Sequence, residues 1–529
     1  MRHDLLDRLE TWKSRFGGPG TDQLEKLLTT IATARVREPD ALIRLHETLL
    51  FLRAYPRSAK VARLADSLLF SFADRVAGSN PSPFEEPEIS GIAGTSLSAV
   101  FSYEVARRLA ARHPRNLDIA WDRYEDIDKL GPVLTRILPL AAEDWPVEAH
   151  APFLQWISAA DRGRGTSLQW FIQSLESLPL APQDRAGLYE SLQLPLTWDI
   201  GNGRTSRSRL RLPGRRLDCH EQPLLRRAEV SLEKELLGPA IPVKRLSKPE
   251  ARKILDLILD TSAMRYRELY GFSHPDDSRV FHADLGRGVE IFFCGVPPQW
   301  RLPLRAYHCG MFFKNGVPAG YVELLSLFER AEVGFNLYYT FRSGETAWLY
   351  ARLLHLFRQV LGVNCFSVDP YQIGHENPEA VDSGAVWFYR KLGFRPVDPE
   401  AAKLMYREEG KMRQAPAYRS SLSTLRKLAK GYIIFEGPGA EAGAWDNFQI
   451  RTLALNAQRA SSGPAPAPGL ALILKLIPDL ARWTEPERLL FTQILRAKEE
   501  SDEARYLRLM QRHPRLRAAM LRAGRNLRR

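Results

Sequence analysis

The stretch from Glu332 to Leu361, EVGFNLYYTFRSGETAWLYARLLHLFRQVL, decides the fold class. Its first nine residues are mostly aromatic, branched or apolar and predict a strand from Glu332 to Thr340. A short polar loop follows, and Arg342 opens a helix that runs to about Leu361. One side of this helix is apolar and is formed by Leu349, Leu353, Leu356 and Val360. A helix of this kind lies flat on a sheet, so the stretch predicts a domain that mixes strands and helices.

Further strands flank this stretch on both sides. Four are expected before it, at 241–246, 289–294, 306–313 and 320–327, and one after it, at 364–368. Asn315-Gly316 predicts a two-residue hairpin turn, because both positions of a type I′ turn need positive φ angles. Ser247 is a serine N-cap, with Glu250 three residues later, so a helix should begin there. A last helix is expected from Ala380 to Leu392, ended by the C-cap glycine Gly393.

The N-terminal third shows almost only helical periodicity. Ala41–Tyr55 carries leucines along one face of a helix, and Val61–Ala77 and Ser96–Ala111 show the same helical periodicity. The fold class is therefore predicted as α+β: a helical N-terminal domain, then a mixed-sheet domain, then a helical C-terminal segment. The expected boundaries are a helical domain at 1–195, an arginine-rich connector at 196–239, the mixed-sheet domain at 240–436, a Pro/Ala/Gly linker at 437–469 and a basic helical tail at 470–529.

Composition excludes several classes of protein. At 529 residues the chain is too long for one ordinary domain, and 44% hydrophobic with 26% charged residues is a globular balance. No run of about 18 apolar residues predicts a membrane span, and the N-terminus lacks the apolar core of a secretory signal, so we expect a cytoplasmic protein. The cysteines contain no CxxC pair, so neither a disulfide framework nor a zinc site is indicated.

The net charge is positive and uneven. Lys plus Arg number 75 and Asp plus Glu 62, which gives +13. Residues 201–216 hold six arginines and no acid, and residues 501–529 hold nine arginines against Asp502 and Glu503. The first segment is typical of a solvated loop, and the second of an amphipathic helix with a frayed tail. Both are candidate surfaces for an anionic macromolecule, and both also fit the solvated face of an arginine-rich protein.

One local motif resembles a known family. The segment Ala385-Val386-Trp387-Phe388-Tyr389-Arg390-Lys391-Leu392-Gly393-Phe394 is similar to the A-x-x-[LF]-Y-x-K-x-G-F element of the GNAT superfamily of N-acetyltransferases. The order of strands and helices from about 240 to 410 resembles the same fold, and Gly320 after the hairpin fits it too. The resemblance implies an acyltransferase that uses acetyl-CoA or another acyl-CoA as co-substrate, and no metal.

The resemblance also implies cofactor-binding positions. The loop before the long helix matches the pyrophosphate-binding loop of the family, where a helix N-terminus receives the phosphates. The strand end beside it would hold the thioester oxygen through backbone N–H groups. The implied residues are Tyr338, Tyr339, Thr340, Arg342, Ser343, Gly344, Glu345, Thr346 and Ala347, together with Asp382, which stands where the family often has Asn.

Glu345 departs from the family pattern, because it occupies the slot of a phosphate-binding glycine. A carboxylate there would compete with phosphate for the helix N–H groups, or would simply stabilise the start of the helix. If it competes, Glu345→Gly should strengthen the binding of coenzyme A.

Four residues are candidates for catalysis. The resemblance implies Tyr389 as the acid that protonates the leaving thiolate, although a tyrosine packed under the last strand would look the same in sequence. Glu323 or Glu332, on the central strands, could take the proton of the amine, or could be ordinary strand carboxylates. His375 lies in the polar loop from Asp369 to Asn377, which fits an acceptor site as well as a loop that caps helices.

Two functions from different classes follow. The first is an acyltransferase whose acceptor is an amine on a small molecule, a protein or an aminoacylated RNA. The second is a non-catalytic GNAT-derived scaffold that binds a nucleic acid or an acidic protein through 201–216 and 501–529. The run from Asp218 to Glu221 (Asp-Cys-His-Glu) is a weaker candidate for a nucleophile or metal site, because no second cluster accompanies it.

Overall fold

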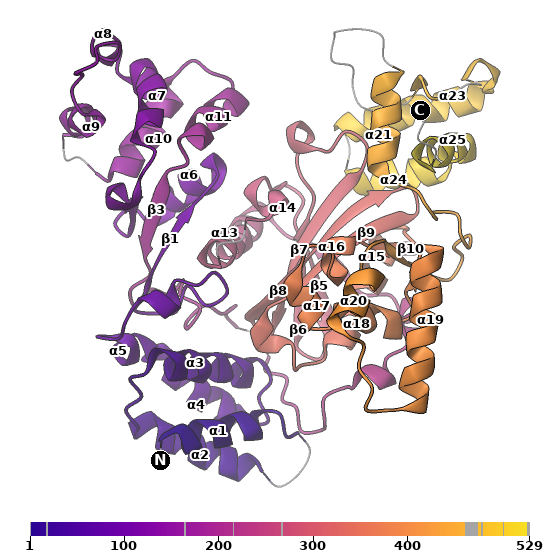
Figure 1. The fold of residues 1–529 in the computed structure, drawn as a ribbon, viewed down its shortest axis with the longest axis horizontal. Helices are drawn as coiled ribbons and strands as arrows, with labels where there is room; N and C mark the ends of the chain where they lie inside the picture. Colours follow the sequence, from indigo (N-terminus) through magenta and orange to yellow (C-terminus); the bar gives the residue numbers. More distant parts are fainter. Residues whose placement is uncertain are drawn as a thin grey trace. The chain divides into compact units, whose positions relative to one another are not determined.

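The computed structural model describes residues 2–16, 20–162, 165–214, 216–265, 268–460, 474–477, 480–500 and 502–525. The chain forms two compact units, and both are discontinuous in sequence. The first unit comprises 1–223, 252–274 and 314–318, and the second comprises 224–251, 275–313 and 319–529. The fold class is α+β as predicted, with helices at the N-terminus, a large mixed sheet in the middle and helices at the C-terminus (Figure 1).

The first unit is mainly helical. Its helices are α1 (Arg2–Lys13), α2 (Thr21–Thr33), α3 (Pro39–Ala54), α4 (Ala59–Phe70), α5 (Phe72–Val76), α6 (Tyr103–Arg112), α7 (Leu130–Ile137), α8 (Ala141–Asp144), α9 (Phe153–Asp161), α10 (Ser167–Ser177), α11 (Pro182–Leu192), α14 (Tyr270–Ser273) and most of α13 (Lys248–Met264). Single 3-10 turns are η1 (Ser82–Phe84), η2 (Trp121–Arg123) and η3 (Ile127–Lys129).

A small sheet in the first unit corrects one prediction. Strands β1 (Ser96–Val100), β3 (Pro195–Asp199) and β2 (Leu117–Ile119) lie side by side in that order and are antiparallel. The sequence predicted helix throughout Ser96–Ala111, but only α6 is helical there. β1 pairs with β3, with Ser96 opposite Asp199, and a partner about 100 residues away leaves no mark on local periodicity.

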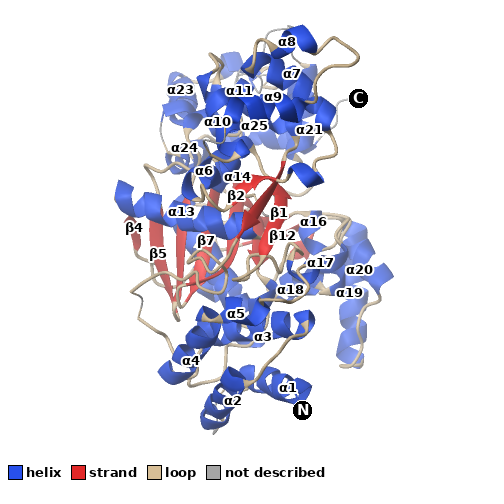
Figure 2. Cartoon of the chain, turned by 90° about the vertical axis from the view of Figure 1, so that its left-hand side faces the viewer, coloured by secondary structure: helices blue, strands red, loops and turns tan. Residues whose placement is uncertain are grey.

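The second unit is built on one nine-stranded sheet (Figures 1 and 2). Its order is β11-β12-β10-β9-β8-β7-β6-β5-β4. The strands are β4 (Val243–Arg245), β5 (Phe281–Gly286), β6 (Val289–Cys294), β7 (Ala306–Lys314), β8 (Val317–Leu327), β9 (Arg330–Leu337), β10 (Cys365–Val368), β11 (Arg395–Pro396) and β12 (Ile433–Glu436). β9 and β10 are parallel, while β8 and β12, on either side of this pair, run antiparallel to their neighbours in it.

Helices and short turns complete the second unit. The helices are α12 (Leu232–Leu236), α15 (Thr346–Leu361), α16 (Pro370–Ile373), α17 (Pro378–Asp382), α18 (Ala385–Lys391), α19 (Pro399–Gln414), α20 (Leu422–Leu428), α21 (Ile450–Arg459), α23 (Glu485–Glu500), α24 (Glu503–Gln511) and α25 (Pro514–Arg525). The 3-10 turns are η4 (Arg227–Glu229), η5 (Pro298–Trp300), η6 (Tyr339–Phe341) and η7 (Leu480–Arg482).

Several local predictions are confirmed and two are wrong in detail. Asn315 and Gly316 have φ angles of 49° and 77°, as a type I′ turn requires. The expected helix Ala380–Leu392 is two helices, because the chain turns through Gly384 with a φ of 65°. The strand expected to reach Thr340 ends at Leu337, where the chain enters η6. The Pro/Ala/Gly run 461–469 lies outside the described residues.

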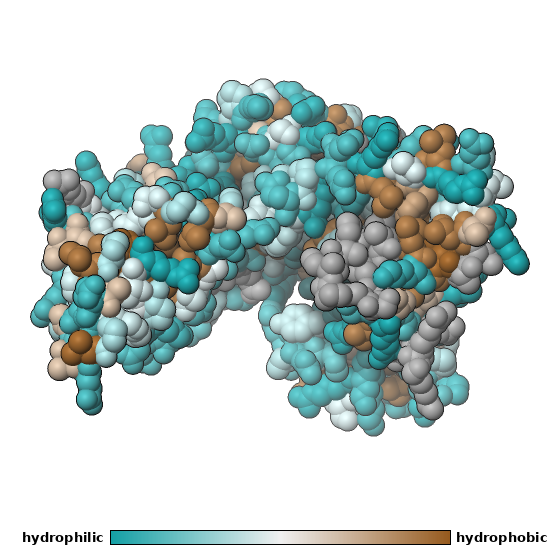
Figure 3. Space-filling view, turned by 90° about the horizontal axis from the view of Figure 1, so that it is seen from above, coloured by the Kyte–Doolittle hydropathy of each residue, from teal (hydrophilic) through white to brown (hydrophobic). Residues whose placement is uncertain are grey.

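The surface drawn in Figure 3 is mainly hydrophilic, with apolar residues in separate groups. In the part of the chain that the structure describes, no helix has the length and apolar character needed to cross a membrane.

Candidate functional site

The two central parallel strands, β9 and β10, separate after three paired residues. Arg330, Ala331 and Glu332 of β9 pair with residues 365–367 of β10, and β10 then ends at Val368 while β9 continues to Leu337. Within the described residues, β9 beyond Glu332 is paired only with β8 on its other side. Since an antiparallel pair uses the N–H and C=O groups of alternate residues, the remaining backbone groups of 333–337 point toward the side that β10 has left. An extended amide chain is the ligand that such an edge fits.

The loop after β9 brings the start of α15 to this divergence. Tyr338 is buried and its N–H donates to the carbonyl of Ala319 over 2.9 Å, which fixes the end of the strand. The turn is closed by Gly344, whose N–H donates to the carbonyl of Phe341 over 2.9 Å. The first residues of α15 have no side-chain cap. Backbone N–H groups at a helix start are a favourable place for an anion.

Glu345 faces away from these N–H groups. Its carboxylate accepts two hydrogen bonds from the Arg287 guanidinium and one from the N–H of Leu225 at 2.9 Å. Arg287 stands at the β5–β6 turn with a φ of 52°, between two glycines that are also left-handed, and its guanidinium lies 5.8 Å from the Trp348 ring. The Glu345 carboxylate thus has a cation as partner, and the effect of Glu345 on phosphate binding stays a prediction.

Arg342, Ser343 and Thr346 lie on the outer side of the loop. Arg342 is exposed and pairs with Glu379 on α17, rather than pointing toward the helix start. Ser343 is exposed, and the Thr346 hydroxyl donates to the carbonyl of Arg342 over 3.2 Å. Ala347 is buried, and so is Thr340. Tyr339 is only partly exposed. The predicted cofactor-binding residues other than Asp382, which lies in α17, thus belong to one continuous segment from Tyr338 to Ala347.

Tyr389 lies in an aromatic cluster on the α15 side of the sheet. Its ring centroid is 5.6 Å from those of Tyr350 and Phe394 and 5.2 Å from that of Phe388. The side chain is buried, and burial raises the pKa of the Tyr389 phenol. The hydroxyl therefore keeps its proton at neutral pH, as an acid must before it reacts. The packed position also matches the structural alternative raised from the sequence.

The two predicted carboxylates lie on the opposite face of the sheet from Tyr350. Glu323 stands directly across from Gly334, and Glu332 across from Leu325, so both project from the same face of β8 and β9. Burial raises the pKa of Glu323, although the hydroxyl of Tyr307 donates to it over 2.5 Å. Glu332 pairs with Arg305 at 3.3 Å and is less suited to accept a proton. Glu323 is the better base of the two.

His375 and Asp382 are not joined to the other candidates. Both are exposed, and among the described residues neither side chain forms a hydrogen bond or ion pair. The rest of their loop serves as helix caps: Asp369 accepts the N–H of Tyr371 over 2.9 Å, and Asn377 accepts the N–H of Ala380 over 3.2 Å. The polar residues that singled out this loop in the sequence mainly cap the short helices beside it.

Three of the six arginines of 201–216 correct the solvated-loop interpretation, while Arg204 and Arg216 are exposed. Arg207 is buried and donates to both carboxylate oxygens of Glu47, at 2.9 and 3.0 Å. Arg211 pairs with Asp66 at 2.6 Å. Arg209 lies 3.8 Å from the Phe70 ring and donates to the carbonyl of that residue. These three arginines contact residues of the first unit and stabilise it.

The C-terminal basic segment is two helices rather than one. Leu507, Leu509, Leu516 and Leu521 are buried, and α24 and α25 pack together. Arg517 is held by Glu329 at 2.8 Å, while Arg512 and Arg522 are exposed. The expected frayed tail, 526–529, lies outside the described residues.

The run Asp218–Glu221 also has a structural role. The His220 ring nitrogen lies 2.6 Å from the ammonium of Lys314, which is itself buried. Nowhere in the described ranges do three or more His, Cys, Asp or Glu side chains gather in a way that could hold a metal ion.

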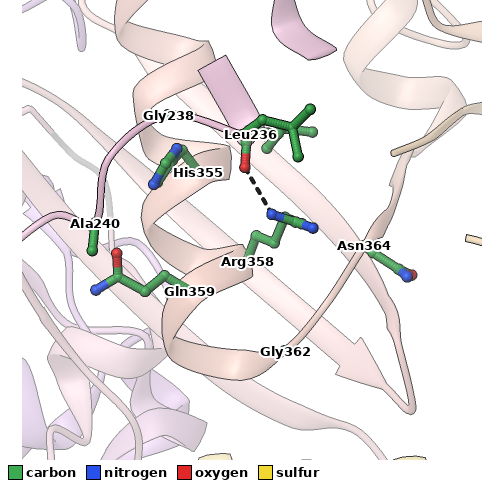
Figure 4. Close-up of a pocket in the computed structure, with 9 residues that line it drawn as sticks. Leu236, Gly238, Ala240, His355, Arg358, Gln359, Gly362 and Asn364 are labelled. Atoms are coloured by element: carbon green, nitrogen blue, oxygen red, sulfur yellow. Dashed lines mark hydrogen bonds between the residues drawn. The ribbon is translucent and has the colours of Figure 1, made fainter. Parts of the chain in front are cut away.

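A hollow of about 410 Å³ lies at the far end of α15 and is lined by polar side chains of that helix (Figure 4). His355 and Arg358 bond to carbonyls of residues 235 and 236, and the Gln359 amide bonds to both backbone groups of Ile241 at 2.7 and 2.8 Å. These side chains hold the end of α12 and the segment that follows it against α15, so we do not assign this hollow as the site.

Two residues that matter here were not found from the sequence. Arg287 and Tyr307 hold the loop carboxylate Glu345 and the candidate base Glu323, respectively. The Gly-Arg-Gly run at 286–288 is a turn signal that could have drawn attention to Arg287. Tyr307 lies in a strand without any local distinguishing feature.

Comparison of the chain with protein-family models, curated proteins and solved structures found no match.

Proposed function

We propose that the second unit is an acyltransferase domain, similar to the GNAT superfamily, that transfers an acyl group from a CoA thioester to an amine. The observation that carries the proposal is the divergence of β9 and β10 next to the start of α15. It offers backbone groups for an extended amide arm and helix N–H groups for a pyrophosphate, and both occur in coenzyme A.

The reaction is a direct attack of the amine nitrogen on the thioester carbonyl carbon. A C–N bond forms, the C–S bond breaks, the amine loses a proton and the thiolate gains one. Glu323 is proposed as the base, directly or through a water molecule, because burial raises the pKa of its carboxyl and so makes it a stronger proton acceptor. Tyr389 is proposed as the acid, because its phenol stays protonated.

The proposed base and the proposed acid lie on opposite faces of the sheet. Glu323 projects from one face of the sheet, and Tyr389 packs near Tyr350 on the other, so acid and base approach the reacting atoms from opposite sides. This arrangement suits a ternary complex, in which the amine and the thioester meet at the divergence of the strands. His375 and Glu332 have no place in this mechanism.

Turnover with a panel of amines tests the proposal. The chain is incubated with acetyl-CoA and with small amines, peptides or aminoacylated RNA, and both free thiol and N-acetylated product are measured. Thiol release that depends on an acceptor, with matching product, supports the proposal. Absence of product with every acceptor, together with no binding of acetyl-CoA, refutes it.

A further inference from the structure

A third basic segment, which the sequence analysis did not single out, joins α19 to β12. Residues 410–435 contain six basic residues and no acid. We define the α19–α20 basic surface as Arg407, Arg413, Arg419, Arg426, Lys427 and Lys430, all of which are exposed. Within the described part of the chain none of the six forms an ion pair, whereas Lys403 and Lys411 on the same helix pair with Glu400 and Glu408. The charge of this surface is therefore not neutralised by the protein itself.

The surface is held in a fixed shape. α19 and α20 pack against each other. The loop between them is tied to α19 through buried Glu408, which accepts hydrogen bonds from the Tyr418 and Ser420 hydroxyls at 2.8 and 2.6 Å. The cations of this surface are thus presented by a rigid scaffold, which lowers the entropy that a ligand loses on binding them.

Tyr406 provides an aromatic ring within the surface. Its side chain is 63% exposed, which is unusual for a residue with so much apolar area. It precedes Arg413 by seven residues, two turns of α19, so the two side chains share one face of the helix. Arg390, itself held by Glu409 at 2.6 Å, lies 5.6 Å from the ring.

We infer that the α19–α20 basic surface binds single-stranded segments of RNA. Exposed cations without carboxylate partners match a phosphate backbone, and an exposed ring among them matches a stacked base. A membrane would require apolar side chains to insert, and of these only Leu422, 48% exposed, stands out on α20. The inference goes beyond the proposed acyl transfer and does not depend on it.

The position of this surface bears on the acceptor. α20 contacts α17, and Arg390 of α18 joins Glu409 of α19, so the surface borders the helices that follow β10. This step alone rests on the proposed function. If that function holds, an RNA bound to this surface lies next to α18, the helix that carries Tyr389. Aminoacylated RNA is then favoured among the three acceptor classes.

Fluorescence anisotropy of the full chain with a labelled oligouridylate of about 20 nucleotides tests the inference without any CoA. The variant Arg413→Glu/Arg426→Glu is compared with Arg512→Glu/Arg522→Glu, which makes the same charge change at exposed arginines of the C-terminal helices. We expect the first variant to bind at least about tenfold more weakly, with a smaller salt dependence, and the second to bind within about twofold of the wild type. Tyr406→Ala should weaken binding by about tenfold.

Three results would overturn the inference. They are no binding by the wild type at low salt, equal weakening by both double variants, and binding of phosphatidylserine vesicles that is lost in the first variant while RNA binding is unchanged. Circular dichroism checks the fold of each variant. If the first variant does not fold, photocrosslinking of the wild type to a 4-thiouridine oligonucleotide decides: crosslinks within 399–430 support the surface, and crosslinks only elsewhere refute it.

Discussion

The carboxylate of Glu345 is clamped by the guanidinium of Arg287, with N–O distances of 2.9 and 2.5 Å. Glu345 is 2% exposed and stands immediately before α15, in a slot where a glycine would let a phosphate approach. Arg287 reaches it from the tip of the β5–β6 turn. The acidic residue in the loop is thus neutralised by a cation from a turn 58 residues earlier in the chain, and this ion pair ties the turn to the start of the helix.

Arg287→Ala is expected to destabilise the protein and to weaken the binding of coenzyme A about tenfold. It leaves a buried carboxylate without its cation, which costs about 3 kcal/mol of the free energy of unfolding and repels phosphate. Urea unfolding and titration calorimetry measure the two effects. The double variant Arg287→Ala/Glu345→Gly should recover most of the affinity. Wild-type affinity in Arg287→Ala would show that phosphates do not bind near this loop.

Tyr389→Phe should leave the fold intact and lower acyl transfer by about 10²-fold, as expected for loss of a general acid. Tyr350→Phe is the matched control: it removes the hydroxyl of a neighbouring buried tyrosine, which has no hydrogen-bond partner among the described residues. Turnover of both variants is compared at one pH. If the two retain equal activity, Tyr389 has no role in the mechanism.

Glu323→Gln should remove the acidic limb of the pH profile of kcat/KM. A base works only when deprotonated, so the rate rises as pH increases through the pKa of Glu323, which burial raises above the usual range of about 4.3. Glu332→Gln, at a carboxylate paired with Arg305, should keep that limb. Profiles of the three proteins are recorded under one buffer series. If the acidic limb of the profile is unchanged in Glu323→Gln, another residue is the base.

The first unit should lose stability as the solution becomes mildly acidic, because of His46. Burial lowers the pKa of this imidazole to about 4, with hydrogen bonds to Glu47 and Ser208 at 3.0 and 2.9 Å. Its folded pKa is depressed, so its contribution is present above the unfolded value of about 6.5 and is lost as pH falls toward the folded value. Urea unfolding should show a loss of about 2 kcal/mol between roughly pH 7 and pH 5. An equal loss in His46→Gln would assign the effect to other groups.

Gly320→Ala should cost about 3 kcal/mol of the free energy of unfolding, since overpacking against backbone is not relieved by rotamer changes. A Cβ at Gly320 would lie 2.2 Å from the carbonyl oxygen of Asn336 and 2.5 Å from the Phe312 ring. Gly310→Ala is the control, because its Cβ meets chiefly the movable end of Ile291 at 2.7 Å. Chemical denaturation of both variants gives the comparison. If the two variants lose the same free energy of unfolding, strands β8 and β9 shift more easily than their pairing suggests to make room for the added Cβ.

Local chemistry predicted much of the second unit. Hydrophobic periodicity, turn residues and helix caps predict, to within a few positions, the strands near Asn315-Gly316, the long helix α15 and the end of α18 at Gly393. The short strands β11 and β12 were missed, because two to four residues carry no periodicity. The break at Gly384 was missed because the apolar pattern continues across it.

Charge could not be interpreted from local sequence alone. The arginines of 201–216 look solvated by composition, yet the partners of Arg207 and Arg211 stand 160 and 145 residues earlier in the chain. The same holds for Glu345, whose cation lies 58 residues away. Conversely, five of the six cations of the α19–α20 basic surface lie in an acid-free run, but only their exposure distinguishes them from the buried arginines.

Isothermal titration of the full chain with coenzyme A and acetyl-CoA, at low and moderate salt, tests the central claim most directly. The divergence of β9 and β10 beside α15 predicts one site in the micromolar range that persists at moderate salt and is weakened by Arg287→Ala. No heat of binding, or a weak signal that disappears with salt, would contradict the account, because a net positive protein attracts any polyanion without a built site.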